Sequence, residues 1–84
     1  MTYSVSILRS AQKSLGSVPS NVQIRIIRVI RQLAATPRSS TVKKLSGRNA
    51  WRIRIGDYRI IYEINDADLL ILVVAIGHRR EIYR

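Results

Sequence analysis

The spacing of apolar residues divides the first half of the chain into three elements. Residues 3–8 (YSVSIL) alternate apolar and polar side chains, which predicts a strand, and we expect it at the edge of a sheet. Residues 9–18 (RSAQKSLGSV) predict a short helix that contacts the core through Leu15 and Val18. Residues 20–36 (SNVQIRIIRVIRQLAAT) repeat apolar positions at about 100° per residue, which predicts a longer helix.

The longer helix is amphipathic and has recognisable ends. Ser20 or Asn21 is the expected cap, and Pro37 forces the helix to stop. The predicted buried arc consists of Val22, Ile26, Ile27, Val29, Ile30, Leu33 and Ala34. The opposite arc consists of Arg25, Arg28, Arg31 and Gln32. We interpret this arginine stripe as a solvated face.

The second half of the chain has the pattern of a sheet. Residues 38–49 are polar and basic and predict a loop with a short extended piece around VKKL, and residues 51–62 (WRIRIGDYRIIY) read as two strands joined by a tight turn. Residues 69–76 (LLILVVAI) do not alternate, so we expect a central strand covered on both faces. The order β-α-α-β-β-β predicts a small α+β domain over 1–84, with two helices on one face of a mainly antiparallel sheet.

The turn at residues 56–57 fixes the pairing of the two strands around it. A two-residue Gly-Asp loop suits a hairpin in which Gly56 supplies a positive φ. Arg54 then lies opposite Arg59, with the like-charge cost of such a pair, and an anion bound between them would turn this cost into a gain. One face holds Trp51, Ile53, Ile55, Tyr58, Ile60 and Tyr62. The other holds Arg52, Arg54, Arg59, Ile61 and Glu63.

Charge is the strongest global signal. Fifteen Lys and Arg against five Asp and Glu give a formal net charge of +10, and twelve of the basic residues are arginine. This excess predicts a polyanionic or acidic partner, although a merely solubilising surface is the alternative. The chain has no cysteine, which excludes disulfides and thiolate metal sites. The apolar run over 69–77 is too short to span a bilayer and the first ten residues lack signal-peptide features, so we expect a cytoplasmic protein without a membrane partner.

Further basic residues extend the predicted arginine face. Continuing the sheet through the turn at 65–68 pairs Ile64 with Leu69 and Arg59 with Val74, which places His78 on the arginine side. Residues that we expect to border this face, and to contact phosphate, are Lys43, Lys44, Arg48, Arg79, Arg80 and Tyr83. A basic face with a tyrosine nearby is typical of a phosphate-backbone site with a base-stacking platform.

Ribonuclease chemistry is compatible with this face. RNA carries its own nucleophile, the 2′-hydroxyl, so such an enzyme needs a base, an acid and cations around the phosphate. The candidates for proton transfer are Glu63, His78, Glu81 and Tyr83, and histidine is the side chain type that titrates near neutrality. No cofactor is expected, and no metal site, because no clustered ligand set is visible and Asp66 and Asp68 read as turn residues.

The stretches KKLSGRNAWRIRIGDYRIIYEI and VVAIGHRREIYR together resemble the RelE toxins of the RelE/ParE superfamily, over nearly the whole chain. The resemblance implies a toxin that cleaves mRNA in the ribosomal A site without a metal, with contacts to 16S ribosomal RNA. It also implies a RelB-like antitoxin as partner, and contact with operator DNA only through the toxin–antitoxin complex. The ParE branch, which shares the fold but inhibits DNA gyrase by protein binding, is the alternative.

The resemblance also implies site residues. The family's two basic positions in the first hairpin strand fall on Arg52 and Arg54, where well-known members have lysines and one lysine is proposed as the general base. The strand arginine falls on Arg59, the arginine after the glycine on Arg79, and the C-terminal tyrosine on Tyr83. Arginine is a poor proton acceptor. Either His78 takes up proton transfer, or the enzyme is slower.

Overall fold

Two helices and five strands make up the part of the chain that the computed structural model describes, which is residues 2–39, 42–45, 47 and 49–78. The elements, in chain order, are β1 (Ser4–Ile7), α1 (Arg9–Gly16), α2 (Ser20–Leu33), β2 (Val42–Lys44), β3 (Ala50–Ile55), β4 (Tyr58–Asn65) and β5 (Leu70–His78). None of the described helices is long and apolar enough to cross a membrane.

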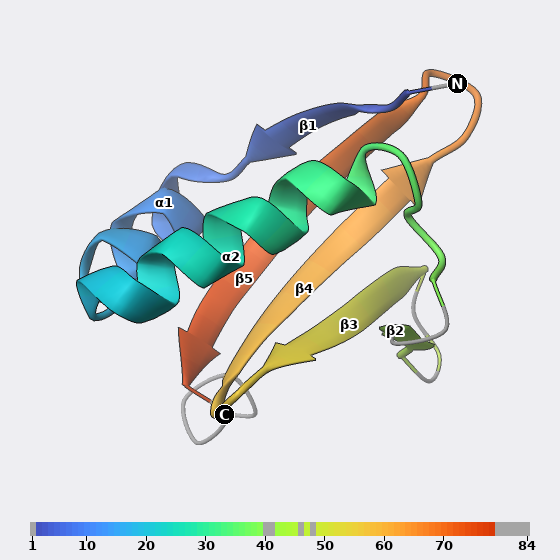
Figure 1. Cartoon of the computed structure of the whole chain (residues 1–84). Coiled ribbons are helices and arrows are strands. Elements are labelled where there is room, and N and C mark those ends of the chain that lie inside the picture. Colours follow the sequence, from blue (N-terminus) through green and yellow to red (C-terminus); the bar gives the residue numbers. More distant parts are fainter. Residues whose placement is uncertain (1, 40–41, 46, 48, 79–84) are drawn as a thin grey trace.

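The strands form one sheet in the order β1-β5-β4-β3-β2, and both helices lie on the same face of it (Figure 1). β1 pairs parallel with β5, and every other neighbour is antiparallel. The predicted α+β architecture and the edge position of the first strand are therefore confirmed. Two details of the prediction are wrong: β4, and not β5, is the middle strand, and the VKKL segment adds a fourth strand after the helices.

The helices begin and end where backbone geometry dictates. Pro19, and not Ser20 or Asn21, is the residue that precedes the first turn of α2, and no side chain caps this end. The helix ends at Leu33, three residues earlier than predicted, and Ala35 and Thr36 continue as a turn bonded to the Gln32 carbonyl.

The buried side of α2 is narrower than the predicted arc. Ile26, Ile30 and Leu33 are buried, whereas Ile27 is 37% exposed. Ile24, which lies next to the arginine stripe, is 59% exposed. The prediction that Ile27 is a core residue is therefore wrong.

The core lies between α1, α2 and one face of the sheet. All six hairpin residues assigned to the core face pack there, and Ile60 and Tyr62 are fully buried. The buried residues from the rest of the chain are Ala11, Val18, Ile26, Ile30, Leu33, Ile64, Ile71, Val73 and Ile76. Burial of these aliphatic and aromatic side chains, at about 25 cal/mol per Å² of apolar surface, is the main favourable term in folding. Within the described residues, no helix lies over the other face of the sheet (Figure 1).

The hairpin between β3 and β4 has the predicted register. Ile55 lies opposite Tyr58, Arg54 opposite Arg59, and Ile53 opposite Ile60. Gly56 has the expected positive φ of 59°, a conformation that L-residues with a side chain adopt only at a cost. A Cβ atom added there would meet no heavy atom within 4 Å, so the requirement for glycine is conformational and not steric.

The predicted register between β4 and β5 is wrong. Ile64 lies opposite Ile71 and not Leu69, because Leu69 adopts a positive φ of 53° in the turn and the strand begins one residue later. A further irregularity between Ile61 and Tyr62 shifts the register by one more residue, and Arg59 lies opposite Gly77. Because side chains alternate between the two faces of a sheet, this single-residue shift places the side chains at the end of β5 on the face opposite to the predicted one.

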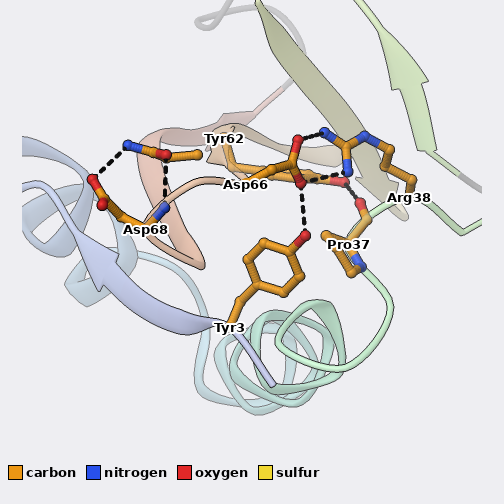
Figure 2. A network of polar contacts seen from close by, with 7 residues as sticks. Tyr3, Pro37, Arg38, Tyr62, Asp66 and Asp68 are labelled. Atoms are coloured by element: carbon orange, nitrogen blue, oxygen red, sulfur yellow. Dashed lines mark hydrogen bonds and ion pairs between the residues drawn. The ribbon is translucent and has the colours of Figure 1, made fainter. Parts of the chain in front are cut away.

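A polar network joins three segments at the end of the sheet away from the hairpin (Figure 2). Asp66 accepts hydrogen bonds from the guanidinium of Arg38 at 2.8 and 3.1 Å and from the hydroxyl of Tyr3 at 2.6 Å. The Arg38 hydrogen bond lowers the pKa of the Asp66 carboxyl, and Asp66 raises the pKa of Tyr3. The network thus ties the first strand and the loop after α2 to the turn between β4 and β5.

The hydroxyl of Tyr62 lies beside this network and donates a 2.6 Å hydrogen bond to the Pro37 carbonyl (Figure 2). Burial raises the pKa of Tyr62 to about 12. The turn itself is closed by the amide of Asp68, which donates to the side chain of Asn65, and this confirms that Asp66 and Asp68 are turn residues.

Candidate functional site

Four cationic side chains converge on the sheet face that no helix covers. They line a shallow hollow of about 120 Å³ and come from three adjacent strands. The residues are Lys43, Arg52, Arg54 and Arg59, and we call this group the basic hollow.

Strand pairing positions each member of the basic hollow. Lys43 of β2 lies directly opposite Arg52 of β3, and Arg54 of β3 lies directly opposite Arg59 of β4. Directly opposite residues have Cβ atoms about 4.5–5.5 Å apart, so each pair places two positive charges within reach of one anion. The predicted like-charge pair of Arg54 and Arg59 is therefore confirmed.

The hairpin turn holds one of these side chains in place. The Nε atom of Arg54 donates a 2.9 Å hydrogen bond to the carbonyl of Gly56, so the side chain is directed back along the turn. The two terminal amino groups of the guanidinium remain as donors for an oxyanion, because arginine carries five N–H donors in all. The turn that fixes the strand register therefore also orients a cation.

The strands that carry the basic hollow are well packed. Ile61, which lies opposite Arg52, is only 6% exposed although it belongs to the face without described helices. The alternate residues of these strands are buried in the core on the other side. A site built on packed strands holds its cations more firmly than one built on loops. Glu63 follows Ile61 on the same face and is exposed, as predicted.

Lys44 lies on the opposite side of the sheet from Lys43. It pairs with Trp51, and its ammonium group lies 5.6 Å from the centre of the Trp51 ring. The guanidinium of Arg38 lies 4.8 Å from the same ring. The prediction that Lys44 borders the arginine face is therefore wrong, because consecutive residues of a strand point to opposite faces.

His78 also lies on the helix-covered side of the sheet. It pairs with Tyr58, and the two rings meet edge to face with their centres 5.6 Å apart and their planes at 85°. Gly77, and not His78, is the β5 residue on the arginine face. The prediction that His78 joins the arginines is wrong, and the cause is the irregularity between Ile61 and Tyr62.

The remaining predicted residues fall outside the described part of the chain. These are Arg48, Arg79, Arg80, Glu81 and Tyr83. Ser14 and Ser17 of the α1 segment, which share a small pocket with His78 and Tyr58, were not predicted as site residues. No local pattern could identify them, because only the packing of α1 against the end of β5 brings them together.

The basic hollow has the chemistry of a phosphate site. Arginine presents a planar set of donors that matches phosphate oxygens, and strands without a covering helix leave room for a chain of nucleotides. The described residues that line it include no carboxylate and no imidazole. It can therefore hold and stabilise negative charge, and the ammonium group of Lys43 can serve as a proton donor within the described lining.

Comparison with known proteins gives this geometry a context. The model of the family described as "ParE toxin of type II toxin-antitoxin system, parDE" matches residues 5–83. Curated protein sequences yield no significant match.

Solved structures with the same fold include RelE proteins of archaea and bacteria. The chain is 34% identical to a chain of the RelE–RelB complex from Pyrococcus horikoshii, with 94% of this chain and 97% of that chain covered and a TM-score of 0.82. It is 30% identical to a chain of the RelB–RelE antitoxin–toxin complex from Methanococcus jannaschii, with 92% and 93% covered and a TM-score of 0.75. The toxin RelE of E. coli in the free state shares the fold at 21% identity, with 99% and 92% covered and a TM-score of 0.83.

The family model spans nearly the whole chain, and the archaeal RelE structures agree with it in fold and in sequence. The chain therefore belongs to the RelE/ParE superfamily, the toxins of type II toxin–antitoxin systems.

Proposed function

We propose that this toxin is a ribosome-dependent endoribonuclease that cleaves mRNA in the A site and so inhibits translation. The observation that carries the proposal is the basic hollow, in which four cations on adjacent strands lie on the sheet face that none of the described helices covers. A sheet face that only had to fold would not need opposed like charges such as Arg54 and Arg59, which cost stability unless an anion lies between them.

The proposed reaction needs no metal ion. The 2′-oxygen of a ribose attacks the adjacent phosphorus and gives up its proton to solvent water, the bond from phosphorus to the 5′-oxygen breaks, and that oxygen takes up a proton. The products are a 2′,3′-cyclic phosphate and a 5′-hydroxyl. Negative charge builds up on the phosphoryl oxygens in the transition state, and Arg52, Arg54 and Arg59 would stabilise it there. Removing one such donor typically costs about 10²–10³ in rate.

Proton transfer requires a different kind of residue. The three arginines stay protonated and cannot serve as bases. Lys43 lies opposite Arg52 in the basic hollow, and its ammonium group can donate the proton that the 5′-oxygen needs. Arg79 and Tyr83 keep the roles that the family resemblance implies, charge stabilisation and contact with a base. Lys43→Arg keeps the charge, so it should lower kcat more than it weakens RNA binding.

We propose a RelB-like antitoxin as the neutralising partner. The two archaeal relatives were solved as complexes of RelE with RelB. The basic hollow calls for an acidic segment on the partner, which would lie across these cations and exclude RNA. Co-purification with a neutral or basic partner that leaves the four cations accessible to RNA would contradict this assignment.

Induced expression with mapping of mRNA ends tests the proposal. Wild-type protein should arrest translation and produce new mRNA ends within codons at the A site, and Arg59→Ala should relieve the arrest. Arg25→Ala is the matched control, because Arg25 is an exposed arginine on α2, on the other side of the sheet. Arrest of equal strength in all three strains would show that the basic hollow is not the site.

The second candidate is inhibition of DNA gyrase by protein binding. The description of the matching family model, which is that of the ParE toxin, favours it. Intact mRNA together with double-strand DNA breaks on induction would establish this activity instead.

A further inference from the structure

A second pocket lies at the end of the sheet where β5 stops, on the helix-covered side. It has a volume of about 130 Å³, and it is lined by Ser14, Ser17, Val18, Tyr58, Gly77 and His78. Val18 and Gly77 are buried, whereas Tyr58 and His78 are partly exposed. The pocket is thus a built concavity that displays two aromatic rings and two hydroxyl groups.

The rings of Tyr58 and His78 are nearly perpendicular. They meet edge to face at 85°, with 5.6 Å between their centres, and so form an L-shaped aromatic wall. A flat aromatic ligand can stack on one ring of such a wall and touch the edge of the other. Base–aromatic stacking is worth about 1–3 kcal/mol per base, and it accepts any base because every base has a π-face.

The hydroxyl groups add selectivity. The Oγ of Ser14 donates to the Ser10 carbonyl at 3.1 Å, and the Oγ of Ser17 donates to the Ser14 carbonyl at 2.9 Å. Each hydroxyl has a single proton, so what remains for the pocket is the acceptor side of both oxygens. A base with an exocyclic amino group brings an N–H donor at its edge to this wall, whereas the free edge of uracil offers a single ring N–H between two carbonyl oxygens.

The pocket adjoins the basic hollow. Tyr58 precedes Arg59 in β4, and His78 follows Gly77, which pairs with Arg59. The two sites are therefore separated by a single residue on each of two paired strands, and they open on opposite faces at the same end of the sheet. An RNA chain that occupies both sites would therefore have to pass around this end of the sheet.

We propose that this pocket binds one RNA base with an exocyclic amino group, namely adenine, cytosine or guanine rather than uracil. The base belongs to the same RNA chain whose phosphate occupies the basic hollow, so the inference rests on the proposed function. The pocket would make the toxin prefer certain bases at one position of the codon. His78, which the strand register separates from the arginines, thus acts in recognition and not in proton transfer.

Fluorescence anisotropy with hexanucleotides that carry 2′-O-methyl riboses tests the proposal, because such RNA lacks the nucleophile and is not cut. One base at a time is removed to leave an abasic site. With wild-type protein, one abasic position should weaken binding roughly tenfold. In His78→Ala, an abasic site at that position should no longer weaken binding. In His78→Phe, which keeps a planar ring, the abasic site should weaken binding as it does in wild type.

A second series addresses the amino group. At the sensitive position, adenine should bind several times more tightly to wild-type protein than purine, which lacks the amino group. The double variant Ser14→Ala/Ser17→Ala should bind the two bases equally, while its affinity for the abasic RNA stays unchanged. Thermal melting of each variant shows whether the fold is intact.

The outcomes separate this inference from the proposed function. Suppose that Arg59→Ala weakens RNA binding but that each abasic site weakens binding equally in wild type and in His78→Ala. The base pocket is then refuted, while the proposed function stands. If Arg59→Ala has no effect on binding either, the proposed function fails as well. If His78→Ala impairs binding of the antitoxin and leaves every RNA affinity unchanged, the pocket is a protein contact and the proposal is overturned.

Discussion

Arg54 and Arg59 lie directly opposite each other, and removing one of these charges should make the free protein less sensitive to salt. Arg54→Gln is the perturbation of choice, because Arg54 is exposed and glutamine keeps part of its aliphatic stem. The variant loses the repulsion of the pair, but it also loses the hydrogen bond from Nε to the Gly56 carbonyl. Loss of the repulsion raises the melting temperature and loss of the hydrogen bond lowers it, so the absolute Tm does not separate the two effects. The salt dependence of Tm isolates the repulsion.

The expected size follows from the geometry of the pair. Like charges directly opposite each other on a sheet cost about 0.2–1 kcal/mol. The Debye length falls from about 30 Å at 0.01 M salt to about 3 Å at 1 M, so high salt removes most of this cost. For a domain of 60–100 residues, 1 kcal/mol corresponds to about 4–8 °C in Tm. Wild-type protein should therefore gain about 1–8 °C more than Arg54→Gln between low and high salt.

Differential scanning calorimetry in NaCl measures this difference. Arg25→Gln on α2 is the control, since it removes the same charge at a position with no arginine directly opposite. A second titration replaces NaCl with phosphate at equal ionic strength, and phosphate should stabilise wild type more than NaCl does, because a bound ion adds RT ln(1 + [L]/Kd) to stability. Identical salt curves for wild type and Arg54→Gln, or no advantage of phosphate over NaCl, would refute the reasoning.

Three further predictions concern stability. Tyr62→Phe removes the 2.6 Å hydrogen bond to the Pro37 carbonyl and should cost about 1–2 kcal/mol in urea unfolding. Because Arg38 lowers the pKa of Asp66, the carboxylate stabilises the fold above the ordinary value of 3.8, and this contribution disappears as the pH falls through the lower folded-state pKa. Asp66→Asn should therefore be less stable than wild type at neutral pH, and the difference should vanish in acid. Gly56→Ala should cost about 1–2 kcal/mol, because the residue has a φ of 59°.

Each of these predictions has a control. Gly16→Ala lies at the end of α1 with an equally open Cβ position and no positive φ, so it should not destabilise the protein. Tyr58→Phe removes a hydroxyl from a partly exposed tyrosine and should cost less than Tyr62→Phe. A stability gap between wild type and Asp66→Asn that persists in strong acid would contradict the assigned role of the carboxylate.

The sequence was sufficient to predict the hairpin and the arginine pair because the turn there is local. A two-residue loop with Gly56 in the left-handed region allows one pairing, and the alternation of side chains then assigns every residue from Trp51 to Tyr62 to a face. The same reasoning identified the core side of the hairpin.

The side of the sheet on which His78 lies could not be predicted, because it depends on the irregularity between Ile61 and Tyr62, which has no pattern in the residues. Leu69 adopts a conformation that non-glycine residues rarely adopt and lengthens the turn before β5, but the partner of Ile64 changes by two residues there, so no side chain changes face. The register shift between Ile61 and Tyr62 moves the side chains at the end of β5 to the face opposite to the predicted one. An error of one residue in the predicted strand register assigns a side chain to the wrong face of the sheet. For this reason His78, a predicted proton-transfer residue, lies beside Tyr58 and Ser14 and not beside the arginines.

The direct test of the central claim, that the basic hollow holds the scissile phosphate, is cleavage by purified protein in a reconstituted translation system. Ribosomes stalled on a defined mRNA are incubated with wild type, Arg59→Ala or Arg25→Ala, and the 5′ ends of the products are mapped. Wild type and Arg25→Ala should cut in the A-site codon at the same rate, and Arg59→Ala should cut about 10²–10³ times more slowly. Equal rates for all three proteins, or intact mRNA with all three, would contradict the claim.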